Sequence, residues 1–166
     1  IIGAGGHARS CIDVIESTKK YKIVGCVAKE TEIDGKNLGY PILGDDTLLP
    51  KLRSKYKNAL ISLGQIKSPK KRIRLYNLLL SNNYHLPTII SPHAYVSKHA
   101  ELGVGTVIMH NSILNAKTRI GNNCIINTKV LIEHDSVIGD HCHIATGAII
   151  NGGVKVGENS FIGSGV

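Results

Sequence analysis

The second half of the chain repeats every six residues. From Ile90 onward an aliphatic residue occupies every sixth position, and four residues after each comes a small or β-branched residue. The aliphatic positions are Ile90, Val96, Leu102, Ile108, Leu114, Ile120, Ile126, Ile132, Ile138, Ile144, Ile150, Val156 and Ile162. This pattern predicts a parallel β solenoid whose inward residues stack from coil to coil at a spacing of about 4.8 Å.

A second period of 18 residues is superimposed on the first. It is marked by four glycines that each follow an aliphatic position: Gly103, Gly121, Gly139 and Gly157. Three six-residue steps therefore make one triangular coil, and we expect these glycines to sit at a corner that needs a positive φ. Cys124 and Cys142 occupy the small inward position one coil apart. We interpret them as core residues, because no C-x-x-C pair suggests a disulfide or zinc site.

The first half alternates between strands and helices. The predicted strands are residues 1–2, 22–27 and 58–63, and the predicted helices are 8–19, from 45 or 46 towards 56, and 68–82, with a loop over 28–44. Such alternation indicates a parallel α/β sheet. We therefore predict a half-Rossmann α/β domain over 1–86 and a β-helix (hexapeptide repeats) over 87–166. About four coils are present, and we expect the β-helix to be incomplete at its C-terminal end.

Charge and composition narrow the possible partners. The net charge is +8, and nine of the 20 basic residues lie between Lys51 and Arg74. We interpret this run as a solvated helical face that attracts anionic, nucleotide-linked substrates. Nucleic-acid binding is disfavoured, since no recognition helix or aromatic platform accompanies the charge. No signal peptide or membrane-spanning stretch is present, so we expect a cytoplasmic protein without membrane insertion.

The richest break in the repeat is the stretch from Glu133 to Asp135. His134 is the third residue of its six-residue step, so its side chain should point outward, and a carboxylate stands on each side of it. An imidazole with a carboxylate partner suits general-base catalysis, because the partner fixes the tautomer and stabilises the imidazolium. Acetyl transfer from a thioester to an amine or hydroxyl needs such a base.

His143 follows His134 by nine residues, which is half a coil. The two side chains should therefore face different directions within one chain. They would meet only across an interface between prisms packed side by side, and a trimer would create three such clefts. Convergence of His134, His141 and His143 on a metal within one chain is disfavoured for the same reason. His110 should lie on another side of the prism.

The N-terminal segment Gly3-Ala4-Gly5-Gly6-His7 is a glycine-rich turn at a helix start. Such turns let backbone N–H groups approach a phosphate. Full dinucleotide binding is disfavoured, because Ala28 and Lys29, followed by Glu30, replace the acidic residue that would hold a ribose.

Taken together, G-A-G-G-H-A from Gly3, I-S-L-G-Q from Ile61 and I-E-H-D from Ile132, followed by hexapeptide repeats, resemble the NeuD/PglD family of sugar acetyltransferases. The resemblance covers the whole chain. It implies a left-handed β-helix, acetyl-CoA as co-substrate without a metal, a homotrimer with active sites between subunits, and a sugar or nucleotide-sugar acceptor held by the N-terminal domain. The acceptor would be a UDP-linked 4-amino-dideoxysugar or a sialic acid of surface glycan synthesis in bacteria.

The resemblance also assigns roles by position. His134 matches the catalytic base and Asp135 its supporting acid, and His143 and Gly152 match residues that contact the acetyl group. Acceptor binding falls on Gly3, Ala4, Gly5, Gly6, His7, Gly64 and Gln65. Ala28-Lys29 departs from the pair of aspartates that many members carry after the second strand, and Lys129 is a further candidate to reach the acceptor.

Two alternatives remain open from the sequence. A non-catalytic β-helix that binds a nucleotide sugar and regulates a partner enzyme has the same repeat. A zinc enzyme similar to the γ-class carbonic anhydrases is the other. Acetyl-CoA consumption and metal analysis distinguish them.

Overall fold

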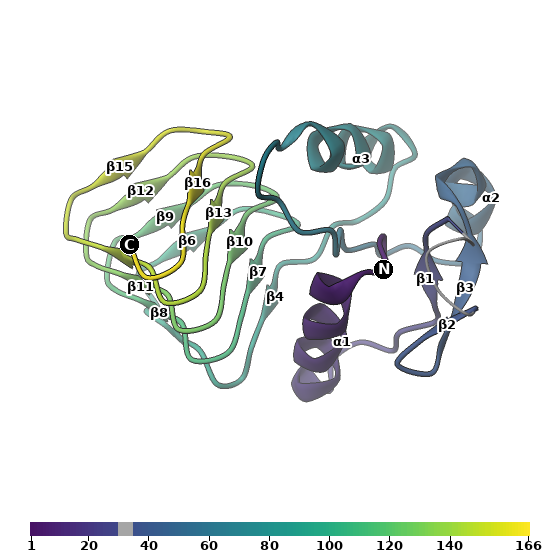
Figure 1. Ribbon diagram of the computed structural model, residues 1–166, viewed down its shortest axis with the longest axis horizontal. Coiled ribbons are helices and arrows are strands. Elements are labelled where there is room, and N and C mark those ends of the chain that lie inside the picture. The colour runs from purple at the N-terminus through teal and green to yellow at the C-terminus, as the bar shows by residue number, and fades with distance from the viewer. Residues whose placement is uncertain (30–34) are drawn as a thin grey trace.

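The computed structural model describes residues 1–29 and 35–166, which form two parts that lie side by side (Figure 1). The elements of the N-terminal part are α1 (Gly6–Thr18), β1 (Cys26–Val27), β2 (Lys36–Asn37), β3 (Tyr40–Gly44), the 3-10 helix η2 (Asp46–Leu48), α2 (Leu49–Arg53) and α3 (Lys70–Ser81). All three predicted helices are present, the second of them divided into η2 and α2.

The predicted parallel sheet of the N-terminal part is confirmed, with shorter strands than expected. Ile2 forms parallel bridges to Val27 on one side and to Ile61 on the other. β1 also pairs in parallel with β3. Of the predicted strand 22–27 only β1 is regular, and the predicted strand 58–63 is reduced to isolated bridges at Asn58 and Ile61. The sheet nevertheless brings the first and third strand ends together.

The predicted loop over 28–44 was partly wrong, because it contains a hairpin. β2 and β3 are antiparallel, and Asn37 pairs with Tyr40 across the turn. Leu38 and Gly39 between them have φ values of 47° and 85°. Two residues with positive φ give the tight turn whose twist matches paired strands. Glu30 and the rest of 30–34 lie outside the described residues.

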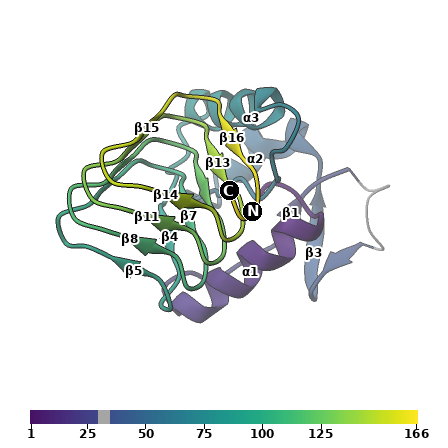
Figure 2. The same cartoon turned by 60° about the vertical axis from the view of Figure 1, so that its left-hand side comes forward.

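The repeat forms a parallel β-helix with three faces (Figure 2). The first face holds β4 (Ile89–Ile90), β7 (Val107–Ile108), β10 (Ile125–Ile126), β13 (His143–Ile144) and β16 (Phe161–Ile162). The second holds β5 (Tyr95–Val96), β8 (Ile113–Leu114), β11 (Leu131–Ile132) and β14 (Ile149–Ile150). The third holds β6 (Glu101–Leu102), β9 (Arg119–Ile120), β12 (Val137–Ile138) and β15 (Lys155–Val156).

The register of the coils is the one that the sequence predicts. Ile126 pairs with Ile108 below and Ile144 above, so partners are 18 residues apart. From Val96 to Ile162 the inward aliphatics form one continuous core, which also includes Cys124 and Cys142 as predicted. Ile90, the first of the series, is outside it and 38% exposed. Both cysteines are fully buried and have free thiols.

The reason given for the corner glycines was wrong. Gly103, Gly121, Gly139 and Gly157 do not have positive φ. A Cβ at Gly103 would instead lie 2.5 Å from the carbonyl carbon of Gly121 in the next coil. Glycine is needed there because backbones approach closely, as its lack of a side chain allows. From Leu102 onward, the left-handed turn position lies three residues after each inward aliphatic: Gly105, Asn111, Lys117, Asn123, Lys129, Asp135, His141, Gly147, Gly153, Asn159 and Gly165.

The outer surfaces of the three faces differ in chemistry. The first face is covered by α1, whose Cys11, Val14 and Ile15 pack against Val107 and Ile125. The third face is polar, with an exposed pair between Arg119 and Glu101 at 3.6 Å. The second face exposes a ladder of apolar side chains in register: Tyr95, Ile113, Leu131 and Ile149. No segment within residues 1–29 and 35–166 covers this apolar ladder.

Candidate functional site

His134 and Asp135 lie in the turn that follows β11, at the corner between the second and third faces. Nδ1 of His134 is 2.8 Å from Oδ2 of Asp135. The carboxylate can only accept, so Nδ1 carries the hydrogen and Nε2 keeps its lone pair. Both side chains are more than half exposed, at 65% and 56%. The outward direction predicted for His134 is thus observed, with a free nitrogen placed to accept a proton.

Only one of the two neighbouring carboxylates partners His134. The carboxylate of Glu133 instead accepts a hydrogen bond of 2.8 Å from the side-chain amide of Asn115, one coil below. Asp135 adopts a left-handed conformation with φ of 61°. That conformation turns its side chain back towards the preceding residue, so the regular turn of the repeat helps to orient the carboxylate on His134.

Gly152 lies one coil above His134, as the 18-residue period requires. A Cβ at Gly152 would lie 2.9 Å from both Cε1 and Nε2 of the His134 ring. The adjacent N–H of Gly153 donates to the carbonyl of His134 at 2.9 Å. The absence of a side chain at Gly152 therefore allows the imidazole ring of His134 to lie against the backbone of the next coil.

The glycine-rich turn forms one wall of a pocket in the N-terminal part, a cavity of about 450 Å³. Its lining includes Gly3, Ala4, Gly5, Gly6, His7 and Gly64 of the predicted acceptor residues. α1 begins at Gly6, and its N-cap Gly5 makes no side-chain cap, so backbone N–H groups at the helix start remain available. The cavity is within the volume range of small-molecule sites.

Charged residues that the sequence reasoning did not assign also line this pocket. Lys29, Lys71 and Arg74 contribute cations, and Asp45 and Asp46 contribute carboxylates. Arg74 pairs with Asp46 at 2.6 Å. The signal for Lys71 and Arg74 was their position in the basic run, but the sequence does not say which members of a basic face turn towards a cavity.

His7 is neutral at physiological pH. Burial lowers its pKa to about 4, and the nearby cation of Arg72 acts in the same direction. Nε2 of His7 is buried without a hydrogen-bond partner among the described residues. Its ring centroid lies 6.5 Å from that of His143. The pocket lined by the glycine-rich turn therefore borders the first face of the β-helix.

His143 lies on this first face and is buried, at 6% exposure. Its Nδ1 donates to the carbonyl of Gln65, and its Nε2 accepts from the side-chain amide of Asn127 at 3.2 Å. Burial also lowers the pKa of His143. Gln65 does not line the pocket; it is buried against the β-helix, where its amide donates to the carbonyl of His141 at 2.8 Å. His134 and His143 therefore occupy different sides of the prism, as expected.

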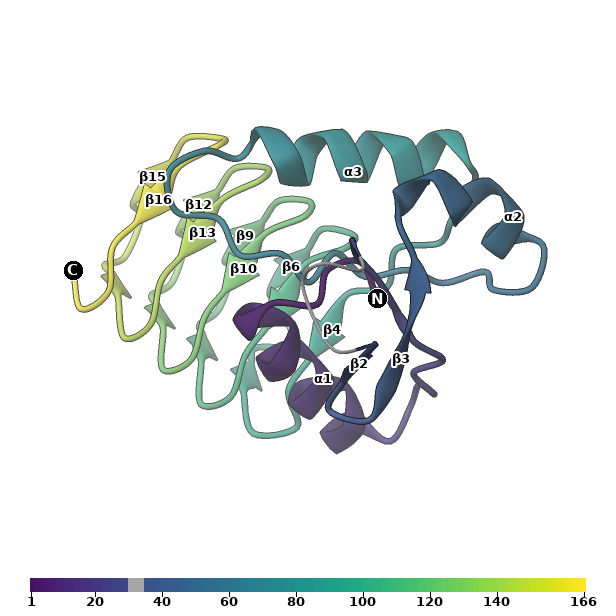
Figure 3. The ribbon, with the colours of Figure 1, turned by 45° about the vertical axis from the view of Figure 1, so that its right-hand side comes forward.

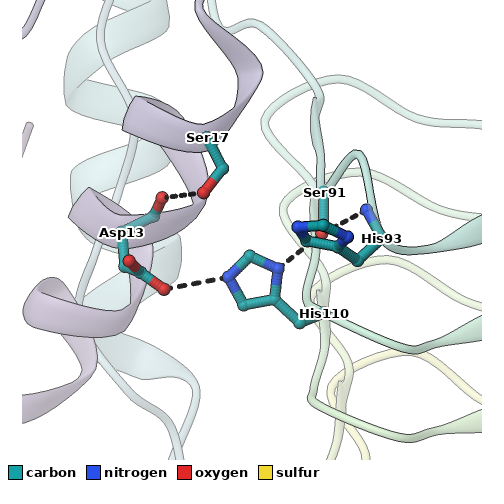
Figure 4. Close-up of polar contacts among 5 residues, drawn as sticks. All are labelled: Asp13, Ser17, Ser91, His93 and His110. Atoms are coloured by element: carbon teal, nitrogen blue, oxygen red, sulfur yellow. Dashed lines mark hydrogen bonds and ion pairs between the residues drawn. The ribbon is translucent and has the colours of Figure 1, made fainter.

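His110 performs a structural task instead. It bridges Asp13 of α1, at 2.9 Å, and the buried Ser91, at 2.6 Å, with His93 beside it (Figure 4). This contact fastens the outer side of α1 to the β-helix. In residues 1–29 and 35–166, no three His, Cys, Asp or Glu side chains are arranged to hold a metal ion.

Two family models match the chain. The PglD N-terminal domain matches residues 1–79. The bacterial transferase hexapeptide repeat matches residues 117–152 and 135–166. No curated protein matches the chain by sequence.

Several solved structures are similar over nearly the whole chain. Perosamine N-acetyltransferase from Caulobacter crescentus, in complex with CoA and GDP-perosamine, is 27% identical with a TM-score of 0.86, covering 99% of this chain and 84% of its own. The acetyltransferase domain of PglB from Neisseria gonorrhoeae is 27% identical with a TM-score of 0.89, covering 99% and 78%. WeeI from Acinetobacter baumannii, 22% identical with a TM-score of 0.86 over 99% of this chain and 76% of its own, shares the fold.

Proposed function

The chain belongs to the NeuD/PglD family of left-handed β-helix sugar acetyltransferases, and from this premise we propose that it transfers the acetyl group of acetyl-CoA to the amine of a nucleotide-linked amino sugar. The observation that carries the proposal is the corner at His134. There an exposed imidazole has its Nδ1 held by Asp135 at 2.8 Å, its Nε2 makes no hydrogen bond among the described residues, and its ring lies against Gly152.

The reaction assigns one task to each of these groups. The neutral amine attacks the thioester carbonyl, a C–N bond forms, and Nε2 of His134 accepts the proton that the amine loses. The C–S bond breaks and the sulfur of CoA leaves as a thiolate that takes up a proton. The charge that develops on the carbonyl oxygen needs a hydrogen-bond donor, and the backbone N–H of Gly152 is our candidate.

The acceptor fits the pocket beside the glycine-rich turn. Lys29, Lys71 and Arg74 suit a diphosphate, as do the N–H groups at the start of α1. A sialic acid, which carries a single carboxylate, needs fewer cations. The solved perosamine N-acetyltransferase holds GDP-perosamine, a nucleotide-linked amino sugar. We therefore propose that the acceptor is a nucleotide-activated sugar.

We further propose that the active protein is a homotrimer, in which the apolar ladder of the second face covers a neighbouring copy. Tyr95, Ile113 and Ile149 are 59%, 41% and 54% exposed. An apolar strip of this kind is a usual mark of an interface. His134 lies at the edge of the same face, so each catalytic corner would adjoin the next subunit.

The trimer is tested by a charge in the ladder. Ile149→Lys should convert a trimer to monomers in analytical ultracentrifugation and remove most activity. The same substitution on the polar third face, Val137→Lys, is the matched control and should leave the trimer intact. A wild-type monomer with full activity would overturn this part of the proposal.

The function itself is tested by an acetyl-transfer screen read by mass spectrometry. Wild-type protein and acetyl-CoA are combined with UDP- and GDP-linked amino sugars, the corresponding hydroxy sugars and free sialic acids. We expect acetylation of a nucleotide-linked amino sugar only. Acetylation of sialic acid alone would correct the acceptor class, and no transfer to any sugar would overturn the function.

We place the reaction in the cytoplasm because acetyl-CoA and nucleotide sugars are made there. None of the described helices is long and apolar enough to cross a membrane.

A further inference from the structure

Arg72 is the largest fully buried side chain of the described chain, at 1% exposure. It projects from α3, which lies along the coils of the β-helix (Figure 3). None of the ion pairs found in residues 1–29 and 35–166 includes Arg72. Burial lowers its pKa to about 10, so the guanidinium is still charged at neutral pH. A buried cation without a carboxylate is costly, and hydrogen bonds offset part of this cost. Both Nη atoms of Arg72 are bonded, whereas its Nε has no partner among the described residues.

The guanidinium binds two different parts of the molecule with two different nitrogens. One nitrogen, Nη1, donates to the carbonyls of Ile61 at 3.1 Å and Leu63 at 2.7 Å. The other, Nη2, donates to the carbonyl of Asn123 at 3.0 Å and to its side-chain oxygen at 2.6 Å. Leu63 lines the acceptor pocket, and Asn123 is a turn residue of the β-helix.

The contact with Asn123 continues into the coil that carries His141 and His143. Because Oδ1 of Asn123 accepts from Arg72, its Nδ2 faces Nδ1 of His141, at 3.0 Å. The carbonyl of His141 in turn accepts from the side chain of Gln65 at 2.8 Å. The hydrogen bond from His143 to the carbonyl of Gln65 closes the connection. A chain of hydrogen bonds therefore starts at Arg72, crosses into the β-helix and returns to Gln65, the residue that follows Gly64 of the pocket lining.

We propose that Arg72 is a positioning residue for acetyl transfer, which fastens the floor of the acceptor pocket to the coil of His141 and His143. This inference rests on the proposed function. In the proposed function the acceptor is bound by the N-terminal part and the acetyl group by the β-helix, so the two reacting atoms are held by different parts of the chain. A misplacement of about 1 Å between such supports is enough to lower turnover by about 100-fold.

The shape of the guanidinium, and not its charge alone, carries this role. Lysine places its three donors on one nitrogen, which cannot reach Leu63 and Asn123 with the same geometry. We therefore expect Arg72→Lys to fail nearly as badly as Arg72→Met. An arginine that served only to attract the anionic acceptor would be replaced well by lysine.

The test separates binding from turnover. Wild type, Arg72→Met and Arg72→Lys are assayed for kcat with the best acceptor of the screen, and the Kd values of that acceptor and of CoA are measured by calorimetry. We expect kcat to fall by at least about 30-fold in both variants, with each Kd changed by less than about threefold. Lys70→Met, an exposed position on the same helix, is the matched control.

A second variant acts from the other side and keeps Arg72 in place. Asn123→Gly retains a residue that tolerates the φ of 52° and removes the amide that receives Nη2. It should reproduce the loss of kcat.

Nitrogen-15 spectra of the imidazole of His143 give a readout independent of activity. Wild type should show hydrogen on Nδ1 alone, and the Arg72 variants should show a mixture of tautomers.

The outcomes are distinguishable. An active wild type whose Arg72 variants keep kcat, or lose only acceptor affinity, overturns the positioning role, as does full rescue by Arg72→Lys. A wild type that transfers no acetyl group overturns the proposed function and the positioning role with it. Unfolded Arg72 variants transfer the decision to Asn123→Gly, for which unchanged kcat and an unchanged His143 spectrum would refute the proposal.

Discussion

Two histidines of the β-helix, nine residues apart, occupy opposite environments. His134 is exposed, has one carboxylate partner and keeps one ring nitrogen free. His143 is buried, and both of its ring nitrogens are occupied by groups of the same chain. The side chain of His134 can therefore still form a bond to another molecule, whereas the ring nitrogens of His143 are already bonded within one subunit. Under the proposed function, the proton transfer takes place at His134, and His143 on another side of the prism contributes rigid packing.

The largest expected effect comes from removing the imidazole of His134. His134→Ala removes the base and should lower kcat by about 10²–10⁴, the usual contribution of general-base catalysis. Folding should be unaffected, because the side chain is exposed. Steady-state kinetics with the best acceptor measure the loss. His99→Ala, another exposed histidine of the β-helix, should behave as wild type. Turnover within threefold of wild type in His134→Ala would remove His134 from the mechanism.

A smaller effect is expected from filling the space beside His134. Gly152→Ala introduces a Cβ 2.9 Å from Nε2, so the exposed ring must rotate away from its position. We expect kcat to fall by about 10–100-fold with little change in Tm. Gly163→Ala is the matched control, because a Cβ there would make only an ordinary contact, 3.6 Å from the side chain of Val166. Equal activities of the two variants would show that the placement of the ring does not matter.

The free energy of unfolding should fall in acid because His7 and His143 are buried. The pKa of His7 falls from 6.5 to about 4 on folding, and that of His143 falls too, mainly through burial. Between these two values the unfolded chain binds a proton that the folded chain excludes, so the stabilisation present above pH 6.5 is lost towards pH 4. His7 alone predicts a loss of roughly 2 kcal/mol between pH 7 and pH 5. Urea titrations measure it, and His7→Gln should flatten the dependence. An unchanged slope in that variant would contradict the assignment to His7.

The smallest effect concerns the exposed contact between α1 and the β-helix. Asp13→Asn weakens the bond to His110, and a surface pair of this kind contributes about 0.5 kcal/mol. The change should appear in chemical denaturation and leave kcat unaltered. A loss of kcat as large as that expected for the Arg72 variants would mean that the contact between Asp13 and His110, rather than the hydrogen bonds of Arg72, holds the two parts in place.

The period of the sequence predicted the β-helix down to its register. Two independent spacings, six and 18 residues, fix which residues face inward and which stack, and Gly152 above His134 follows from them alone. The glycine corners show the limit of this reasoning. A recurrent glycine indicates that a side chain is excluded, but it does not say whether the backbone angle or a neighbouring backbone excludes it.

The N-terminal part was less predictable because its contacts are not periodic. The hairpin formed by β2 and β3 is short and half exposed, so it leaves little alternation of polar and apolar residues. Arg72 was interpreted as one member of a solvated basic face, yet it is buried. Its partners are backbone carbonyls and one asparagine far along the chain, and no local pattern identifies such partners.

The four buried cysteines have a consequence for following the protein in time. Cys11 and Cys26 lie in the α/β part, whereas Cys124 and Cys142 lie inside the prism, and none is accessible in the folded state. Alkylation of each thiol can therefore proceed only when its surroundings open. Pulsed labelling followed by peptide mapping would record separate opening rates for the two parts, with no probe added to the chain.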